Sequence, residues 1–550
     1  MEGGLADSTD VAGAARRLLG YDRLLPGQEE AVAALLGGHD VLAVMPTGGG
    51  KSAVYQLAGA LVKGTVVVIS PLLALQRDQV AALDGSGLGA ARVLNSDLSA
   101  SQQDEVLAGV ADGSVKFLFA GPEQLQRVSA AEALFRSPPA LVAVDEAHCV
   151  CSWGHDFRPD YRRLAPVIEM WDHPRVVALT ATASPPVREE IVDALGLRRP
   201  VVVVAGFDRP NIGLAVEHFA QAEDKDAAVV DRAAASEGCG LVYAATRRRC
   251  EELAGAMVDR GVDAVAYHAG LGRRVRHEVE QAFMGGAVRV VVATTAFGMG
   301  VDKPDVRFVL HADVADSLDS YYQEIGRAGR DGDPAAAVLF FRSEDLGLRR
   351  FFAGGHTPEP AETLVVLHAL RTARAPLSVE ELEERVELSV GRLESIVAAL
   401  ERAGAVEVLP GGAMLVDPDG PDAKQAWLEV EQESEAHARL EQSRVDMMRA
   451  YADTRACRRH HLLGYFGEPT GARCGNCDNC LTGVVDDTDD DRAGAGRFPV
   501  GATVLHGTFG RGEVLRRDGD EMVVFFSDAG YRTLSERLVV DNDLLRPAPA

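Results

Sequence analysis

The chain has 550 residues, of which 47% are hydrophobic and 25% charged, and a formal net charge of −26. This balance is typical of a soluble protein with several packed cores, and the length predicts about three to five domains. No apolar run approaches the ~20 residues of a membrane-spanning helix, and the start, Met1 to Asp10, is acidic and polar, unlike a secretory signal. We therefore expect a cytoplasmic protein without membrane contact. The charge excludes a uniformly basic surface for a polyanion and leaves a local basic track as the alternative.

Short β-branched runs alternate with longer amphipathic stretches from about residue 30 to residue 345. This alternation is typical of parallel sheets covered by helices, and Asp97–Val110 is one such helical stretch. Pro210 interrupts both helix and strand in the segment Phe207–Asn211, after which the alternation begins again. We therefore predict two α/β domains, residues 1–206 and 207–350. The predicted strands are Val41–Val44, Val66–Ile69, Leu141–Val144 and Val176–Leu179, then Gly240–Tyr243, Ala264–Tyr267, Val288–Ala293 and Phe308–Leu310.

A glycine-rich loop follows the first of these strands. Met45–Ser52 enters a predicted helix, where glycines let backbone N–H groups close around phosphate oxygens and the helix dipole favours an anion. In such a loop Lys51 reaches the terminal phosphates of ATP and Ser52 ligates Mg²⁺. Met45 occupies the first glycine position of the general pattern, so a plain glycine-rich turn is the alternative. The predicted phosphate-binding residues are Thr47, Gly48, Gly49, Gly50, Lys51 and Ser52.

Two carboxylates end the strand Leu141–Val144. Asp145 is expected to hold Mg²⁺ through water, and Glu146 to polarise the water that attacks the terminal phosphate. A carboxylate pair at the end of a strand can also cap a helix. The glycine-rich loop upstream favours the catalytic interpretation.

A third element lies in the second α/β domain. Gln323–Gly332 holds Arg327 and Arg330 between glycines, which suits an approach to phosphate. We predict that Gln323, Arg327 and Arg330 act in catalysis and that Arg330 supplies an arginine finger. The alternative is a surface loop with salt bridges.

The chain changes character after residue 360. A helix, then helices capped by Ser378 and Ser389, then an apolar hairpin around Pro410-Gly411-Gly412, predict a winged-helix-like domain at 361–418. A polar helix from about Asp422 leads into a helical zinc-binding subdomain at 422–482. The acidic run that follows predicts a disordered linker at 483–497. Glycine-rich turns between short strands predict a small β-barrel at 498–550.

Four cysteines cluster in this C-terminal part. Cys457, Cys474, Cys477 and Cys480 supply four thiolates with two CxxC steps, which predicts a closed tetrahedral Zn²⁺ site. A reducing cytosol argues against disulfides. An iron–sulfur cluster, or three cysteines with His460 or His461, are the alternatives. The surrounding basic residues predict a segment that braces the α/β domains and offers a DNA-facing surface; they are Arg439, Arg444, Arg449, Arg455, Arg458, Arg459 and Arg473.

Together these motifs resemble the RecQ branch of superfamily 2 DNA helicases. The zinc segment matches, and the other matching strings run in family order: Gly27–Glu30, Met45–Ser52, Ser70–Leu72, Asp145–His148, Trp153–Pro159, Leu179–Ala183, Phe207–Ile212, Tyr267–Leu271, Phe297–Gly300 and Tyr322–Gly332. The resemblance implies two RecA-like lobes, ATP, Mg²⁺ and Zn²⁺ as cofactors, 3′-to-5′ movement along single-stranded DNA, and a place in DNA repair or recombination at the nucleoid.

The resemblance also assigns further site residues. It implies that Tyr21 and Gln28 recognise adenine, and that the loop around Trp153 senses single-stranded DNA. The aromatic rings offer stacking faces and the arginine a phosphate or cation–π contact; a buried aromatic cluster is the alternative. The DNA-binding residues predicted in this loop are Trp153, His155, Phe157 and Arg158.

The chain departs from the family pattern in several places. Leu24-Leu25 replaces the usual aromatic–Arg pair, and the winged-helix-like domain precedes the zinc segment. Its hairpin lacks the aromatic tip that relatives use as a wedge, so we expect unwinding to be weaker than translocation. Its candidate recognition helix sets Arg392 and Arg402 against two glutamates, so a scaffold or protein-contact role weighs as much as DNA binding.

The end of the chain carries a second resemblance. Val504–Gly512, through Leu545, is similar to the Tudor-like tail of UvrD-type helicases, which implies a module that docks a protein partner. The expected nucleic-acid partners are single-stranded and tailed duplex DNA, and we expect a monomer. Two other functions remain open: an RNA helicase, and a zinc/winged-helix DNA-binding regulator with a nucleotide switch.

Overall fold

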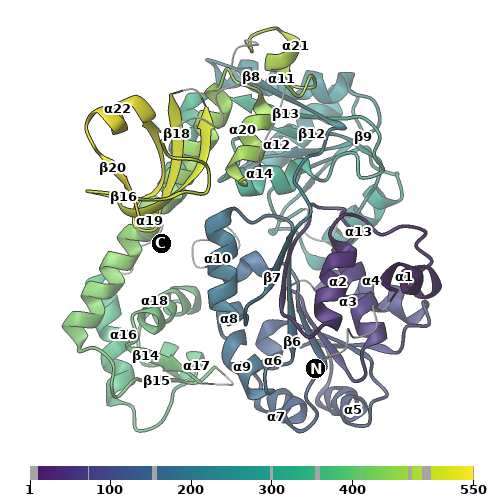
Figure 1. Ribbon diagram of the computed structural model, residues 1–550, viewed down its shortest axis with the longest axis vertical. Coiled ribbons are helices and arrows are strands. Elements are labelled where there is room, and N and C mark those ends of the chain that lie inside the picture. Colours follow the sequence, from purple (N-terminus) through teal and green to yellow (C-terminus); the bar gives the residue numbers. More distant parts are fainter. Residues whose placement is uncertain are drawn as a thin grey trace, which may run out of the picture.

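The computed structural model describes residues 10–71, 73–151, 158–297, 302–353, 359–409, 412–468, 473–485, 497–518 and 520–548. Two parallel α/β units, here called lobe 1 and lobe 2, stand one above the other in Figure 1. No helix within the described residues combines the length and the apolar character needed to cross a bilayer.

Lobe 1 is built on a seven-stranded parallel sheet in the order β3-β4-β2-β5-β6-β1-β7. Its inner strands are short Val- and Leu-rich runs buried on both faces, as parallel strands covered by helices must be. The strands are β1 Val41–Val44, β2 Val66–Ile69, β3 Ala91–Leu94, β4 Phe117–Ala120, β5 Leu141–Val144, β6 Arg175–Thr180 and β7 Val201–Val204. The helices are α1 Val11–Leu19, α2 Gln28–Leu36, α3 Lys51–Leu61, α4 Leu73–Asp84, α5 Ala100–Ala111, α6 Pro122–Leu125, α7 Val128–Arg136, η1 Ala147–Val150 (a 3-10 turn), α8 Pro159–Arg162, α9 Leu164–Met170 and α10 Pro185–Ala194.

Lobe 2 is a six-stranded parallel sheet in the order β10-β11-β9-β12-β13-β8, so β8 is an edge strand. The strands are β8 Ile212–His218, β9 Cys239–Tyr243, β10 Ala264–Tyr267, β11 Val290–Ala293, β12 Val306–His311 and β13 Ala335–Phe341. The helices are α11 Ala222–Ala235, α12 Arg247–Asp259, α13 Arg273–Met284, α14 Leu318–Ile325, η2 Ser343–Asp345 and α15 Leu346–Ala353. The prediction of two parallel-sheet units is therefore confirmed, and the predicted strands lie within two residues of the observed ends.

The winged-helix-like elements follow lobe 2 and lie beside lobe 1 (Figure 1). They are α16 Pro360–Thr372, α17 Val379–Glu383, α18 Val390–Arg402, β14 Val406–Val408 and β15 Met414–Val416. Ser378 caps α17 as predicted, because its side chain accepts from the backbone N–H of Glu381 in a capping box. Helix α17 is two residues shorter than predicted, and Pro410 and Gly411 of the hairpin turn lie outside the described residues.

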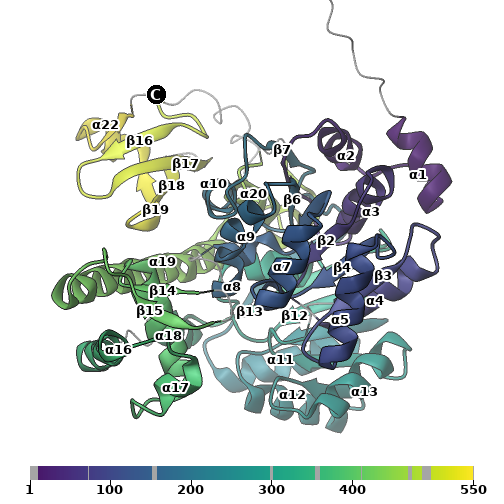
Figure 2. The same cartoon turned by 90° about the horizontal axis from the view of Figure 1, so that it is seen from below.

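A 31-residue helix, α19 Ala423–Asp453, runs past both lobes and separates the winged-helix-like elements from the C-terminal sheet (Figures 1 and 2). Beyond it come α20 Arg458–Tyr465 and α21 Asp478–Leu481. The C-terminal sheet is antiparallel, in the order β19-β18-β17-β16-β20, where a small β-barrel was predicted. Its elements are β16 Thr503–His506, β17 Gly510–Asp518, β18 Glu521–Phe526, β19 Gly530–Ser535, α22 Glu536–Asp541 and β20 Leu545–Pro547. Most of the predicted disordered linker, 486–496, lies outside the described residues.

A buried ammonium group joins three segments of lobe 2. Lys225 of α11 is 1% exposed, and its Nζ donates to the carbonyl of Ala312 at 2.6 Å and to the carboxylates of Asp313 at 3.0 Å and Asp345 at 2.5 Å. The lysine thereby ties α11 to the segments that follow β12 and β13. Three acceptors compensate the cost of burying the charge.

Replacing this lysine tests whether the buried charge holds lobe 2 together. Lys225→Met keeps the volume and leaves two poorly solvated carboxylates short of a cation, so we expect a loss of about 3–5 kcal/mol in the free energy of unfolding of lobe 2. Urea unfolding of the full chain measures it. The matched control is Arg232→Ala on the same helix, whose pair with Glu217 is exposed and contributes about 0–1 kcal/mol. Equal effects of the two changes would contradict the prediction.

Candidate nucleotide site and zinc centre

The loop between β1 and α3 has the backbone of a phosphate cradle. Gly48 and Gly50 have φ angles of 80° and 66°, which residues with a side chain rarely adopt. The N–H of Gly49 donates to the carbonyl of Pro46 at 2.8 Å and closes the turn in front of helix α3. Within the described chain, Oγ1 of Thr47 is buried without a hydrogen-bond partner. A helix N-terminus, a glycine turn and an unsatisfied hydroxyl fit a bound phosphate.

Lys51 and Ser52, predicted to bind the terminal phosphates and Mg²⁺, begin helix α3. Nζ of Lys51 lies 3.5 Å from the carbonyl oxygen of Met45, so the ammonium group lies back over its own loop. Tyr55, one turn further on, is buried near Ser52 and Asp145. Burial and then the Asp145 charge raise the pKa of its hydroxyl, whereas a hydrogen bond with Ser52 lowers it. The fold therefore brings Ser52 and Asp145 to the same place.

Asp145 reaches this place from the end of β5. Strands β1 and β5 are parallel and separated only by β6, so their carboxyl ends share one edge of the sheet. Burial and the Glu146 carboxylate raise the pKa of Asp145 to about 7, against the opposing Lys51 ammonium. An added cation reverses both effects, which suits a Mg²⁺ site. Glu146 has a φ of 49°, an uncommon conformation for a residue with a side chain and one found often at functional sites.

The neighbouring histidine belongs to this arrangement, although the sequence did not single it out. Nδ1 of His148 lies 3.0 Å from Oγ1 of Thr180 and 3.4 Å from Oε2 of Glu146. The Thr180 hydroxyl donates to the carbonyl of Thr182 at 2.9 Å, so its oxygen must accept from the imidazole. His148 is therefore protonated on Nδ1, and it connects the carboxylate to the segment after β6.

Lobe 2 contributes the side chain of Arg330. A β-carbon built on Gly48 would lie 3.6 Å from Cγ of Arg330, so the arginine packs directly on the P-loop of lobe 1. Its Nη1 pairs with the exposed Asp302 at 2.5 Å. Arg327 and Gln323 are buried at 7% and 9% exposure, in and just after helix α14. The predicted approach of the two motifs is thus present in the fold.

The interlobe linker contains a residue that sequence reasoning missed. Nη1 of Arg209 donates to the carbonyl of Thr47 in the P-loop and to that of Gly326, both at 3.3 Å. Its Nη2 donates to the carbonyls of Ala328 at 3.0 Å and Gly329 at 2.9 Å. One guanidinium therefore joins the P-loop to the turn that carries Arg327 and Arg330. The string Phe207–Ile212 contained the signal as a match to the family, but neither that match nor the linker interpretation assigned Arg209 a role.

The two residues predicted for adenine recognition differ in solvent exposure. The amide of Gln28 is buried: Nε2 donates to the carbonyls of Gly49 at 3.2 Å and Gly50 at 2.9 Å, and Oε1 accepts from the N–H of Leu25 at 2.8 Å. It braces the P-loop in this structure. Tyr21 is 45% exposed. Their roles toward adenine stay predictions.

Only one residue of the predicted DNA-sensing loop can be placed. Trp153, His155 and Phe157 lie outside the described residues. Arg158 is described: its N–H donates to the carbonyl of Cys149, and Nη1 donates to the carbonyl of Pro71 at 3.2 Å. The loop therefore ends against the segment after β2, one strand away from Asp145 in the sheet.

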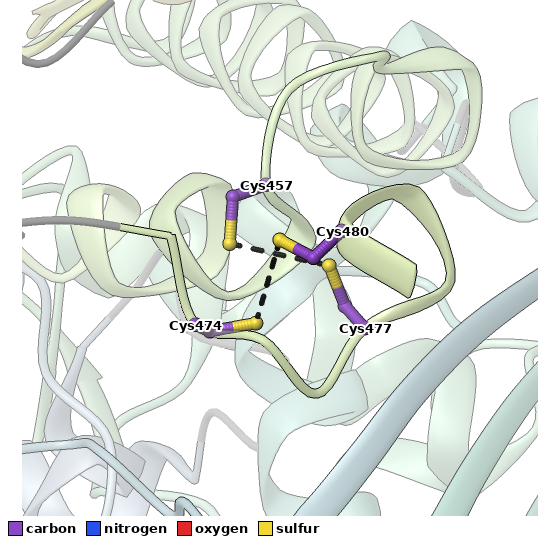
Figure 3. A group of neighbouring side chains, drawn as sticks. All are labelled: Cys457, Cys474, Cys477 and Cys480. Atoms are coloured by element: carbon purple, nitrogen blue, oxygen red, sulfur yellow. Dashed lines mark hydrogen bonds between the residues drawn. The ribbon is translucent and has the colours of Figure 1, made fainter. Parts of the chain in front are cut away.

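The four clustered cysteines point at one another from three short segments (Figure 3). Their sulfur atoms all lie within 4.8 Å, with Cys474 to Cys480 at 3.9 Å and Cys457 to Cys477 at 4.0 Å. A tetrahedral zinc site with Zn–S bonds of about 2.3 Å requires sulfurs about 3.8 Å apart, whereas a disulfide requires about 2.05 Å. The geometry fits Zn²⁺ held by four thiolates, and neither His460 nor His461 belongs to the cluster.

The cysteine module, α20 and α21 with the loops that bear the four cysteines, covers the exposed edge of lobe 2. Leu214 of β8 donates to the carbonyl of Asn476 at 3.2 Å and forms a parallel bridge to Cys477. Asp478 accepts from the N–H of Val216 at 2.9 Å. The module thus continues the sheet beyond its edge strand, which would otherwise present unpaired backbone groups.

The predicted basic surface is wrong for three of its arginines. Arg444, Arg458 and Arg459 are at most 6% exposed, because their charges are used inside the protein. Arg444 pairs with Glu441, Arg458 with Asp478 at 2.6 Å, and Arg459 with Asp208 in the linker at 2.5 Å. Arg459 ties the module to the linker and to lobe 2, Arg458 joins α20 to α21 and to α19, and Arg444 is paired within α19. These three buried arginines present no basic track to solvent.

The arginines of the winged-helix-like elements are also paired internally. Arg392 binds Glu362 of α16 at 2.6 Å, and Arg402 binds Glu433 of α19. The carboxylate of Glu401 on the same helix accepts from Nε and Nη2 of Arg163 in lobe 1, at 3.1 and 2.8 Å. Helix α18 therefore contacts lobe 1 through an ion pair, which favours the scaffold interpretation.

Comparisons with known proteins agree with this arrangement. The profile of the DEAD/DEAH box helicases matches residues 25–191, that of the helicase conserved C-terminal domain residues 224–332, and that of the RecQ zinc-binding domain residues 422–481. The chain is similar to the ATP-dependent DNA helicase RecQ of Pasteurella multocida, at 35% identity over 84% of this chain and 61% of that protein. It is also similar to the probable ATP-dependent DNA helicase RecS of Bacillus subtilis, at 40% identity over 60% of this chain and 67% of that protein. The chain spans about three fifths of the length of the first RecQ relatives that it matches.

Solved structures share the fold. The DUF1998 helicase MrfA bound to DNA has a TM-score of 0.52 at 18% identity and covers 77% of this chain and 64% of its own. The Mycobacterium smegmatis helicase Lhr, bound to single-stranded DNA and AMP-PNP, has a TM-score of 0.50 at 23% identity and covers 77% and 62%. At these identities the likeness concerns the fold alone, and it confirms the tandem RecA-like arrangement.

Removing one cysteine tests the zinc centre. We expect the purified chain to contain about one Zn²⁺, and Cys477→Ser to lose it, because a closed structural site needs all four thiolates. Elemental analysis measures the metal, and proteolysis near β8 reports the uncovered edge. The matched control is Cys239→Ser, a partly exposed thiol outside the cluster, which should keep full zinc content. Iron in place of zinc, or unchanged zinc in Cys477→Ser, would contradict the prediction.

Proposed function

The chain belongs to the RecQ family of helicases, and we propose that it is a DNA-dependent ATPase that moves 3′ to 5′ along single-stranded DNA and separates tailed duplexes. It hydrolyses ATP with Mg²⁺ as the cofactor and holds Zn²⁺ as a structural metal. It serves DNA repair or recombination, acts as a monomer, and resides in the cytoplasm at the nucleoid.

One observation carries this proposal: Arg330 of lobe 2 packs against Gly48 of lobe 1. A site divided between two lobes closes when ATP joins them and opens after hydrolysis. A polymer held across both lobes is then moved once per cycle. A site within one lobe gives no such coupling.

Each catalytic group has a role that its position supports. Gly48–Ser52 and Thr47 hold the phosphates, with Lys51 at the terminal ones, and Ser52 and Asp145 hold Mg²⁺. The ion supplies charge neutralisation on the phosphates. Glu146, oriented through His148, accepts the proton of the attacking water. Arg330 neutralises charge that develops in the transition state, and Arg209 positions the turn that carries it. Gln323 of α14 and Arg327 are the further catalytic residues that we propose.

DNA is favoured over RNA because the relatives that share the zinc segment are named DNA helicases. The nucleotide site and the two lobes alone do not distinguish DNA from RNA. The regulator alternative is disfavoured because Lys51, Asp145, Glu146 and Arg330 form a complete set at one site. The aromatic loop at 153–158 stays the predicted DNA sensor.

The arginine finger is tested by Arg330→Ala. We expect kcat of ATP hydrolysis with single-stranded DNA to fall about 10³- to 10⁵-fold, because transition-state charge loses its partner while ATP still binds. Arg260→Ala, which removes a similar but exposed pair with Asp231, is the matched control and should hydrolyse normally. Lys51→Ala should also abolish turnover. A regulator would show little hydrolysis in the parent protein and little change in any variant.

The choice of polymer and direction is tested with tailed substrates. We expect single-stranded DNA to stimulate hydrolysis more than RNA, and strand displacement on 3′-tailed duplexes but not on 5′-tailed or blunt ones. Hydrolysis and displacement are measured in the same reaction. We expect displacement to be weak relative to translocation, and robust unwinding of a long 3′-tailed duplex would refute that part. Equal stimulation by RNA would favour the RNA helicase alternative.

A further inference from the structure

The C-terminal sheet is seated on helix α19. The N–H of Tyr531 donates to Oγ of Ser443 at 3.0 Å, and the preceding Gly530 has a φ of 71°. A β-carbon on Gly530 would lie 2.3 Å from that same oxygen. Only glycine allows strand β19 to approach the helix this closely. The sequence predicted a tethered module, whereas the fold gives it a fitted seat.

A second contact attaches the sheet to the cysteine module. Nη1 of Arg516 lies 2.8 Å from Nδ1 of His461 on α20, and its stem lies over Gly464. Helix α20 is itself bound to the edge of lobe 2 through Arg459 and the carbonyl of Ile212 at 2.7 Å. The C-terminal sheet is therefore carried on the lobe 2 side of the molecule.

One side chain of this sheet reaches lobe 1. The Tyr531 hydroxyl lies 3.3 Å from Oγ of Ser184 in lobe 1 and 3.0 Å from the hydroxyl of Tyr465 on α20. Tyr465 donates to Oδ2 of Asp319 in lobe 2 at 2.5 Å. These four residues, which are at most 5% exposed, form what we call the hydroxyl junction.

The junction touches the moving parts of the proposed motor. Ser184 directly follows Thr180–Ala183, the segment that meets His148, and it precedes helix α10. Asp319 lies in the first turn of α14, the helix that leads to Arg327 and Arg330. The junction therefore spans the two segments whose relative position decides whether Arg330 reaches the P-loop.

We propose that Tyr531 is a positioning residue, through which the C-terminal sheet fastens lobe 2 to Ser184 of lobe 1 and stabilises the closed arrangement of the nucleotide site. The inference rests on the proposed function. Tyr531 and Tyr465 are joined to Asp319 of lobe 2, while Arg188 of lobe 1 donates to the carbonyl of Phe466 at the end of α20 at 2.8 Å. Opening of the lobes therefore strains the contact to Ser184 together with this second contact. A hydroxyl contact of 3.3 Å is weak enough to break in each cycle.

Burial keeps this contact neutral. The pKa of Tyr531 is raised to about 12 by its burial, next by the Asp319 charge, so the hydroxyl stays protonated near neutral pH. A neutral hydroxyl can donate or accept as the lobes move.

Lobe closure is measured directly by fluorescence energy transfer. Dyes are placed at the exposed Arg136 of lobe 1 and Arg248 of lobe 2 through unnatural amino acids, which spares the zinc cysteines. The full chain is titrated with Mg²⁺ and AMP-PNP on single-stranded DNA. We expect Tyr531→Phe to raise the half-closing concentration about threefold to tenfold, the effect of one hydrogen bond, and to raise KM for ATP more than it lowers kcat.

Four variants distinguish a coupling role from general damage. Ser184→Ala should shift closure in the same direction as Tyr531→Phe, which also removes the contact to Tyr465. The double variant should add little to Tyr531→Phe, because both changes remove the contact between Tyr531 and Ser184. Gly530→Ala, which unseats β19, should shift closure at least as far. The matched control is Tyr451→Phe: its hydroxyl lies 3.2 Å from that of Tyr321, also buried, but between α19 and lobe 2, so closure should not change.

The possible results separate the two proposals. If the parent chain closes and hydrolyses ATP while Tyr531→Phe and Ser184→Ala close at the parent concentration, the inference is overturned and the proposed function stands. If Tyr451→Phe shifts closure as much as Tyr531→Phe, the effect is general destabilisation and the inference is again overturned. If the parent chain neither closes nor hydrolyses ATP, both proposals fail.

Discussion

The packing of one arginine on one glycine across the interlobe gap is the constraint on which this molecule depends. Arg330 packs on the P-loop beside Gly48, where a β-carbon would be in ordinary contact with its Cγ at 3.6 Å, because lobe 2 is held at one orientation. Neither lobe alone contains the glycine-rich loop, the two carboxylates and Arg330. Arg209 shows how the constraint is met: its guanidinium donates to backbone carbonyls of both motifs, so the two loops are placed against each other without the side chain of Arg330. In the proposed mechanism Arg330 is therefore preorganised by an interaction separate from its own role.

The same constraint explains the C-terminal half. Orientation between two lobes requires material that contacts both, and the long helix α19 with its attached modules supplies it. The buried Arg458 forms an ion pair with Asp478 at the edge of lobe 2, and the buried Arg459 forms one with Asp208 in the linker. The Zn²⁺ site folds the chain that carries these arginines. Three of the seven arginines in this basic segment are thus buried and paired inside the protein.

Local patterns predicted the local structure well. The apolar runs gave β1, β2 and β5 at their observed residues, because a strand buried on both faces must be a continuous apolar run. The P-loop, the carboxylate pair and the four cysteines were found because their spacing alone encodes their chemistry. The contacts that sequence reasoning missed join residues far apart in the chain: Arg209 to the P-loop, His148 to Thr180, Tyr531 to Ser184. Arginine in a linker and tyrosine in a strand carry no local signature of a partner more than a hundred residues away. Burial of Arg444, Arg458 and Arg459 was missed because a charged side chain is assigned to the surface unless its pairing is known, and only Arg459 has a distant partner, Asp208.

These long-range contacts form one continuous path. Glu146 lies beside the His148 imidazole, which donates to Thr180; Thr180 donates to the carbonyl of Thr182, and two residues later Ser184 meets Tyr531. A single segment of lobe 1 therefore contacts, through His148, the Glu146 carboxylate that we propose activates water, and at its other end the C-terminal sheet. Residues 180–184 are buried, so in the proposed junction a displacement of Tyr531 acts on packed side chains and not on solvent. A module at the far end of the chain is thereby connected to the chemistry through a few hydroxyl groups, and its seat on α19 decides which lobe it follows.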